Sequence, residues 1–183
     1  NWVTMPDQYV LSALQHKERE RFNRAPIMVE VALVSSHAPW TPVASLVPWS
    51  EIGDGAIFNA QAQSGPTPEE VWRDLSSIRD HYRQTIEYML TSMVSFVTEF
   101  GDDDVVVLLL GDHPPAPMIS GDQDTDQVIA HLIASDPKVI EAVSRWEWQK
   151  GMLPNGDAPV WRMDDLRDRF IKDFSQETTK AIE

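Results

Sequence analysis

The sequence predicts an α/β fold in one domain over residues 1–183, with a mixed, mostly parallel sheet flanked by helices. Three short apolar runs, at 27–34, 105–110 and 128–134, predict buried strands. They alternate with longer segments of helical periodicity, which is typical of parallel or mixed sheets with helices on their faces. With 183 residues, 42% of them apolar, the chain can bury a sizeable core.

The first elements are a surface helix, a strand and a long loop. Pro6-Asp7 begins the segment 6–24, in which apolar residues are spaced among charges as on a surface helix. The strand at 27–34 is followed by residues 41–67, which are rich in Pro, Gly, Ser and Trp and predict an irregular loop. Loops of that length often have a function, for example as lids.

A long helix is predicted in the middle of the chain. At Thr67-Pro68-Glu69-Glu70, Thr suits the N-cap, Pro the first helical position and Glu the third. Apolar side chains then recur at helical spacing from Ile78 to Phe100. Gly101 is expected to end this helix.

Beyond the strand at 105–110, residues 114–127 are rich in Pro and Asp and predict a loop. After the strand at 128–134, Asp136-Pro137 is expected to begin a helix that runs to about Lys150. A last amphipathic helix is predicted over 164–174.

The composition excludes several classes of function. The chain carries 15 basic and 29 acidic residues, a net charge of −14, which argues against nucleic acid or an anionic membrane surface as a partner. It contains no cysteine, so disulfides and thiolate chemistry are excluded. No run approaches the roughly 18 consecutive apolar residues that a membrane-spanning helix needs.

The strand at 105–110 ends abruptly in Gly111, Asp112 and His113. In α/β sheets, ligands bind beyond the carboxyl ends of the strands. A carboxylate next to an imidazole at such a place suits a divalent metal ion. The alternative is that both side chains cap the next turn and bond to backbone.

A second motif, Ser35-Ser36-His37-Ala38-Pro39-Trp40, follows the strand at 27–34. His37 could donate a hydrogen bond to an oxyanion or protonate a leaving oxygen, and Trp40 could form a wall of the pocket. The alternative is an ordinary surface-loop histidine. We expect two adjacent strands to bring His37 and the Asp112–His113 pair to a common cavity.

These two motifs, with the helix between them, resemble the C-terminal half of the alkaline phosphatase superfamily over roughly residues 26–135. The chain is most similar to the sulfatase-like branch that includes lipoteichoic acid synthases and phosphoethanolamine transferases. The resemblance implies the C-terminal part of an alkaline-phosphatase-like sandwich. It also implies metal-dependent hydrolysis or transfer, with a phosphate or sulfate ester as substrate.

The resemblance also implies roles for single residues. Asp112 and His113 match the metal ligands, and His37 matches a substrate-binding histidine. Leu33 stands where two-metal members carry an aspartate, which favours one divalent ion, Mn, Mg, Zn or Ca.

In this family the nucleophile lies in an N-terminal half that no stretch of this chain matches. The resemblance therefore implies that this half is a partner from the same protein and that the isolated 183 residues are inactive. It further implies membrane attachment through upstream helices, with this domain on the extracytoplasmic face.

A different class of function remains open. The chain could be a non-catalytic binding or assembly module that retains the fold and binds a partner or wall component through the loop 41–67. Binding of a ligand through that loop without uptake of metal would favour this alternative.

Overall fold

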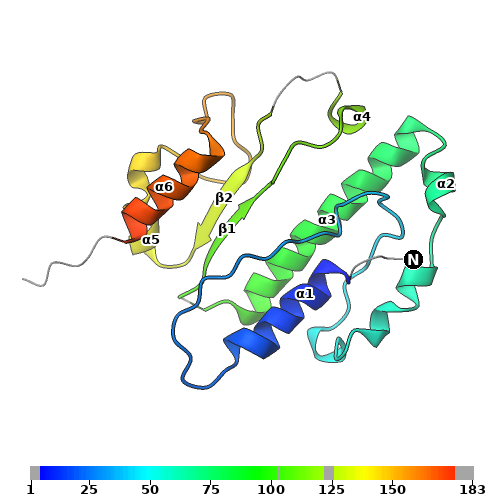
Figure 1. Ribbon diagram of the computed structural model, residues 1–183, viewed down its shortest axis with the longest axis horizontal. Coiled ribbons are helices and arrows are strands. Elements are labelled where there is room, and N and C mark those ends of the chain that lie inside the picture. The colour runs from blue at the N-terminus through cyan, green and yellow to red at the C-terminus, as the bar shows by residue number, and fades with distance from the viewer. Residues whose placement is uncertain (1–4, 103, 122–125, 176–183) are drawn as a thin grey trace, which may run out of the picture. The chain divides into compact units, whose positions relative to one another are not determined.

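The computed structural model describes residues 5–102, 104–121 and 126–175 (Figure 1). They belong to two compact units: unit 1 comprises residues 1–101 and 115–123, and unit 2 comprises 102–114 and 124–183. The described residues are mostly helical, and their strands form only a two-stranded antiparallel sheet. The prediction of a mostly parallel α/β sandwich is therefore wrong.

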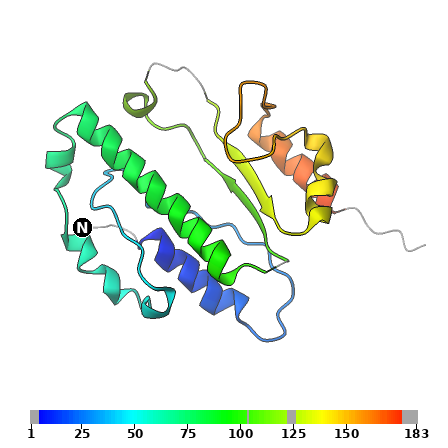
Figure 2. The ribbon, with the colours of Figure 1, turned by 180° about the vertical axis from the view of Figure 1, so that it is seen from behind.

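Unit 1 is built from helices and helical turns. In chain order its described elements are α1 (Asp7–Leu14), a π-helix (Gln15–Arg19), three 3-10 turns (Trp49–Glu51, Ala56–Phe58 and Gln61–Gln63), α2 (Pro68–Val71), α3 (Leu75–Phe100) and α4 (Pro117–Ser120). Figures 1 and 2 show α1 lying alongside the C-terminal half of α3. Leu11 of α1, with Tyr88 and Phe96 of α3, is buried in the core of this unit.

The predicted long helix is interrupted near its start. Thr67 and Glu70 form the expected capping box, but the helix that they begin, α2, ends at Val71. Asp74 then starts α3, because its carboxylate accepts a hydrogen bond from the backbone N–H of Ser77 at 2.9 Å. Gly101 follows the last residue of α3, as predicted.

The run 27–34 forms no strand, so this prediction is also wrong. Residues 27–34 have β-forming side chains, but a strand also needs a neighbouring strand for its backbone hydrogen bonds. No strand of the described residues pairs with 27–34, and Met28 is 89% exposed.

The long loop 41–67 is irregular, as predicted, but it packs tightly against the rest of unit 1. Ile52 and Phe58 are each only 1% exposed. The loop reverses direction through its short 3-10 turns, and Gly55, at φ +88°, makes one of these reversals possible. This segment contributes to the core of the unit.

Unit 2 contains the sheet. The strands β1 (Val106–Leu110) and β2 (Ala130–Ala134) pair antiparallel with Val106 opposite Ala134, which confirms the positions of two predicted strands. A parallel pair needs a crossover of a dozen or more residues, usually a helix. In its described part, the connection between β1 and β2 contains only the four-residue α4.

The rest of unit 2 packs around one tryptophan. Its remaining described elements are α5 (Pro137–Ala142), a 3-10 turn (Ser144–Trp146) and α6 (Met163–Phe174). Trp146 is 1% exposed, packs with Val143 and Leu166, and donates its indole N–H to Asp173 at 2.6 Å. The predicted last helix is confirmed as α6, whereas the helix expected to reach Lys150 ends at Ala142.

Among the described residues, no helix has both the length and the apolar character that crossing a bilayer requires.

Candidate functional site

Asp112 and His113 follow directly on the end of β1, where the sequence places them. Both side chains are open to solvent, at 90% and 74% exposed. Gly111 lets the chain pass close to Val128, because a Cβ atom at this position would lie 3.2 Å from the Cβ of Val128. The N–H of Gly111 donates to the carbonyl oxygen of Ile129 at 3.3 Å, which holds the end of the strand, while the next two side chains face water.

The imidazole of His113 is oriented by its own loop. Nδ1 lies 2.8 Å from the carbonyl oxygen of Pro114. Since a carbonyl can only accept, Nδ1 carries the proton, and in the neutral ring Nε2 keeps its lone pair. Histidines that bind a metal ion through one ring nitrogen usually donate the other ring N–H to a carbonyl or carboxylate in this way.

The free nitrogen of His113 and the carboxylate of Asp112 converge. Nε2 lies 3.7 Å from Oδ2 of Asp112. Two ligand atoms that are each about 2.0–2.1 Å from a tetrahedral metal ion lie about 3.3 Å from each other. A small rotation of the two side chains therefore brings both atoms to one ion. The donor set therefore fits a divalent cation, although no group of three or more His, Asp or Glu side chains among the described residues could hold one.

His37 lies in unit 1 and has the same local arrangement as His113. Its side chain is exposed, and Nδ1 lies 2.8 Å from the carbonyl oxygen of Ala38. Again the carbonyl fixes the proton on Nδ1 and leaves Nε2 free. In both motifs the accepting carbonyl belongs to the residue after the histidine, and a proline follows it.

Trp40 is a buried part of the same loop. It is only 7% exposed, its φ is +61°, and its indole N–H donates to the carbonyl oxygen of Ser36 at 2.8 Å. The ring stacks on Trp72, with centroids 5.2 Å apart, and meets the edge of Tyr82 at 5.5 Å. Of these two stacked tryptophans, Trp72 is the more accessible to solvent, at 40% exposed.

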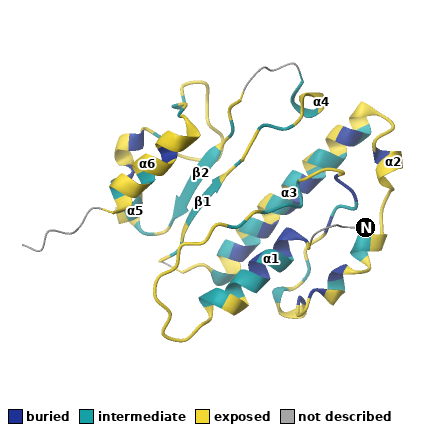
Figure 3. Cartoon of the chain, viewed as in Figure 1, coloured by how far each residue is buried: buried dark blue, intermediate teal, exposed yellow. Residues whose placement is uncertain are grey.

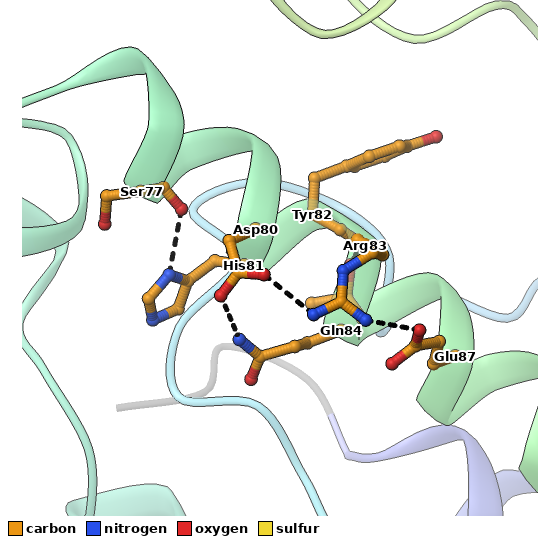
Figure 4. A network of polar contacts seen from close by, with 8 residues as sticks. Ser77, Asp80, His81, Tyr82, Arg83, Gln84 and Glu87 are labelled. Carbon is orange, nitrogen blue, oxygen red and sulfur yellow. Dashed lines mark hydrogen bonds and ion pairs between the residues drawn. The ribbon is translucent and has the colours of Figure 1, made fainter.

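Next to Tyr82, the outer face of α3 carries an exposed network of ion pairs. Figure 4 shows Arg83 between Asp80 and Glu87, with Tyr82 on another side of the helix. Hydrogen bonds from Arg83 and Gln84 lower the pKa of Asp80, and burial raises the pKa of Tyr82. The ion pairs stabilise the helix surface by the usual spacing of three and four residues.

The four predicted residues thus fall into two local pairs. Asp112 and His113 belong to unit 2, and His37 and Trp40 belong to unit 1. The structure brings the side chains of Asp112 and His113 together, whereas His37 and Trp40 share a loop. The expectation that two adjacent strands deliver the two motifs is wrong, because residues 27–34 form no strand.

Sequence analysis missed two residues at the start of α1, Asp7 and Gln8, which are both fully buried. Figure 3 shows the buried residues at this end of α1. The Asp7 carboxylate accepts hydrogen bonds from the backbone N–H groups of Val34 at 2.8 Å and Ser35 at 2.9 Å. Burial raises the pKa of Asp7, and the hydrogen bonds from Ser35 and Val34 oppose that rise.

The side-chain amide of Gln8 makes two hydrogen bonds to the backbone of Val47. Its Nε2 donates to the carbonyl oxygen of Val47 at 2.7 Å, and its Oε1 accepts from the N–H of Val47 at 3.0 Å. The backbone N–H of Gln8 donates to the hydroxyl of Tyr88, whose pKa burial raises to about 12. The only sequence signal here is Pro6-Asp7, which predicts a helix start and says nothing of these distant partners.

Comparison with known proteins adds no identification. No family model matches the chain, and no curated protein and no solved structure shows significant similarity to it. Function is therefore inferred from the local geometry of the two histidine motifs.

Proposed function

We propose that Asp112 and His113 hold one divalent cation in a protein that hydrolyses or transfers phosphate or sulfate esters. The observation that carries this proposal is the pair of potential metal ligands that follows β1. Nε2 of His113, left unprotonated by the bond of Nδ1 to Pro114, lies 3.7 Å from the carboxylate of Asp112. Both groups are exposed, as an ion and its substrate require.

When bound, a cation here supplies charge stabilisation to the non-bridging oxygens of the ester, worth several kcal/mol in the transition state. The chain contributes the placement of two ligands at the end of a short strand. One imidazole and one carboxylate suit Mn or Zn better than Mg or Ca, because Mg and Ca prefer oxygen ligands. The other ligands would be water or groups beyond the described residues.

In unit 1, His37 is proposed as the substrate-binding residue. Its free Nε2 can accept a proton and then donate a hydrogen bond to an oxyanion or a leaving oxygen. Trp40 is proposed to shape this position through the loop backbone, because little of its ring is exposed.

The nucleophile is proposed to come from polypeptide outside this sequence, as the resemblance to sulfatase-like enzymes implies. The same resemblance supports a place on the extracytoplasmic face of the membrane, in a protein anchored by helices elsewhere in its chain. Both statements are open to a direct test in the full-length protein.

The test of the metal site is addition of Mn²⁺ to the ¹⁵N-labelled chain. We expect paramagnetic broadening to be strongest at the resonances of Asp112 and His113. Asp112→Ala should remove this local broadening, whereas Asp157→Ala, an exposed aspartate of the same unit, should leave it unchanged. Broadening spread evenly over the many acidic residues would contradict the proposal.

A second test uses activity. In the full-length protein, Asp112→Ala should abolish hydrolysis or transfer of the ester, and undiminished turnover would overturn the assignment. A protein that takes up no metal, but binds a ligand through residues 41–67, would support the non-catalytic alternative.

A further inference from the structure

The loop that carries His37 is held by several hydrogen bonds on its downstream side. Indole N–H groups donate to two of its carbonyls, that of Ser36 from Trp40 and that of Pro39 from Trp72. The hydroxyl of Thr41 donates to Pro66 at 2.7 Å. Residues 36–41 are therefore fixed relative to α2 and to the residues before it.

On the upstream side, the same loop is held by α1. Pro6, the residue before α1, provides no side-chain cap. Instead, the hydroxyl of Ser35 accepts a hydrogen bond from the N–H of Asp7 at 3.0 Å, and the carboxylate of Asp7 accepts one from the N–H of Ser35 at 2.9 Å. These reciprocal bonds have the pattern of a capping box, but they join segments 28 residues apart.

This contact is unusual in its burial. Asp7 is fully buried, and its second oxygen, Oδ2, has no hydrogen-bond partner among the described residues. A buried carboxylate with an unpaired oxygen is costly, so a purely structural position would be filled more stably by an uncharged side chain. The second hydrogen bond that the carboxylate accepts, from the N–H of Val34 at 2.8 Å, also comes from the backbone that leads to His37.

We propose that Asp7 is a positioning residue for His37. By fixing the backbone N–H groups of Val34 and Ser35, the Asp7 carboxylate sets where the turn to His37 begins. That turn is closed by the bond from the N–H of His37 to the carbonyl oxygen of Val34 at 3.0 Å. Its role in substrate binding rests on the proposed function of His37, but its effect on the imidazole does not.

The test is the ¹⁵N NMR spectrum of the His37 imidazole, which reports the protonated nitrogen. In the wild-type chain we expect the Nδ1–H form that the bond to Ala38 requires. Asp7→Asn keeps an acceptor at Oδ1 and should preserve this form. Asp7→Ala removes the acceptor and should convert His37 to the tautomer mixture of a free histidine.

A loss of fold would also change the imidazole, so hydrogen exchange provides a second measurement on folded chains. In wild type, the amides of Val34 and Ser35 should exchange about tenfold more slowly than the amide of Leu33, because only the first two have the Asp7 acceptor. Ser35→Ala removes the bond from the N–H of Asp7 but leaves both backbone bonds to the Asp7 carboxylate, and should keep most of this protection. Asp74→Ala removes another carboxylate of unit 1 and should not affect it.

Unprotected amides at Val34 and Ser35 in wild type would overturn the proposal. So would an unchanged His37 tautomer in a folded Asp7→Ala chain. Neither result bears on the Mn²⁺ experiment at Asp112, and a negative Mn²⁺ result leaves the His37 tautomer unaffected. Failure of this proposal is thus distinguishable from failure of the proposed function.

Discussion

Two aspartates of this chain show opposite use of the same side chain. Asp7, in unit 1, is fully buried, and its carboxylate binds the backbone of two residues far along the sequence. The Asp112 side chain, in unit 2, is 90% exposed, and the hydrogen bond found at its carboxylate is a 3.0 Å bond from the adjacent N–H of His113. Asp7 therefore stabilises the conformation of the backbone, whereas the carboxylate of Asp112 is available to a ligand.

The strongest test of this contrast is removal of the buried carboxylate. Asp7→Ala leaves the N–H groups of Val34 and Ser35 without their acceptor and should lower the free energy of unfolding of unit 1 by about 2–4 kcal/mol. Urea unfolding followed by the NMR signals of α3 reports on unit 1 alone. Asp74→Ala, an exposed carboxylate that also accepts two hydrogen bonds, is the control and should cost less. If the two variants lose the same free energy of unfolding, burial gives the Asp7 carboxylate no greater effect on stability than an exposed one.

The residue next to Asp7 allows the same comparison with an uncharged group. Gln8→Ala should cost about 2–3 kcal/mol, because it removes both bonds to Val47 inside the unit. Gln61 binds the backbone of Ser45 in the same two-sided way, but at an exposed position. Gln61→Ala should therefore cost about 0.5–1 kcal/mol in the same urea experiment. If the exposed contact proves as costly as the buried one, burial is not what gives the start of α1 its importance.

A smaller effect should appear in the pH dependence. Burial raises the folded-state pKa of Asp7 above its unfolded value, so its contribution to stability is complete below the unfolded pKa and is lost as pH rises through the folded pKa. Relative to Asp7→Asn, the wild type should therefore lose stability as the pH rises through and above the unfolded pKa of aspartate.

Asp74 provides the control with the opposite sign. Hydrogen bonds from Ser76 and Ser77 lower its pKa, so its contribution is present above the unfolded pKa and is lost as pH falls through the folded pKa. Relative to Asp74→Asn, the wild type should gain stability as the pH rises from below towards the unfolded pKa of aspartate. If the wild type gains stability relative to both Asn variants as the pH rises, burial does not raise the pKa of Asp7.

The sequence predicted those features that depend on neighbouring residues. The positions of β1 and β2, the capping box at Thr67 and the end of α3 at Gly101 are all encoded within a few residues. The local order of Gly111, Asp112 and His113 after a strand is of the same kind. For these features, side-chain type and spacing determine the backbone directly.

Features that depend on distant partners could not be predicted. The run 27–34 has the composition of a strand, but whether it becomes one depends on a neighbouring strand, and the described residues offer none. The direction of the β1–β2 pair depends on the connection, which contains only α4 in its described part. Asp7 finds its partners 27 and 28 residues away, and no spacing rule reveals such a contact.

The smallest expected change in stability is at Asp112, and it completes the comparison. Asp112→Ala removes a side chain whose one short contact is to the next amide, so the urea midpoint of unit 2, followed by the NMR signals of α6, should not shift measurably. Asp173→Ala is the contrasting variant in that unit. It leaves the buried indole N–H of Trp146 without its acceptor and should cost about 1–3 kcal/mol. A clear loss of stability in Asp112→Ala would mean that this carboxylate holds the end of β1 in place, and the case for an ion at this position would then lose its main support.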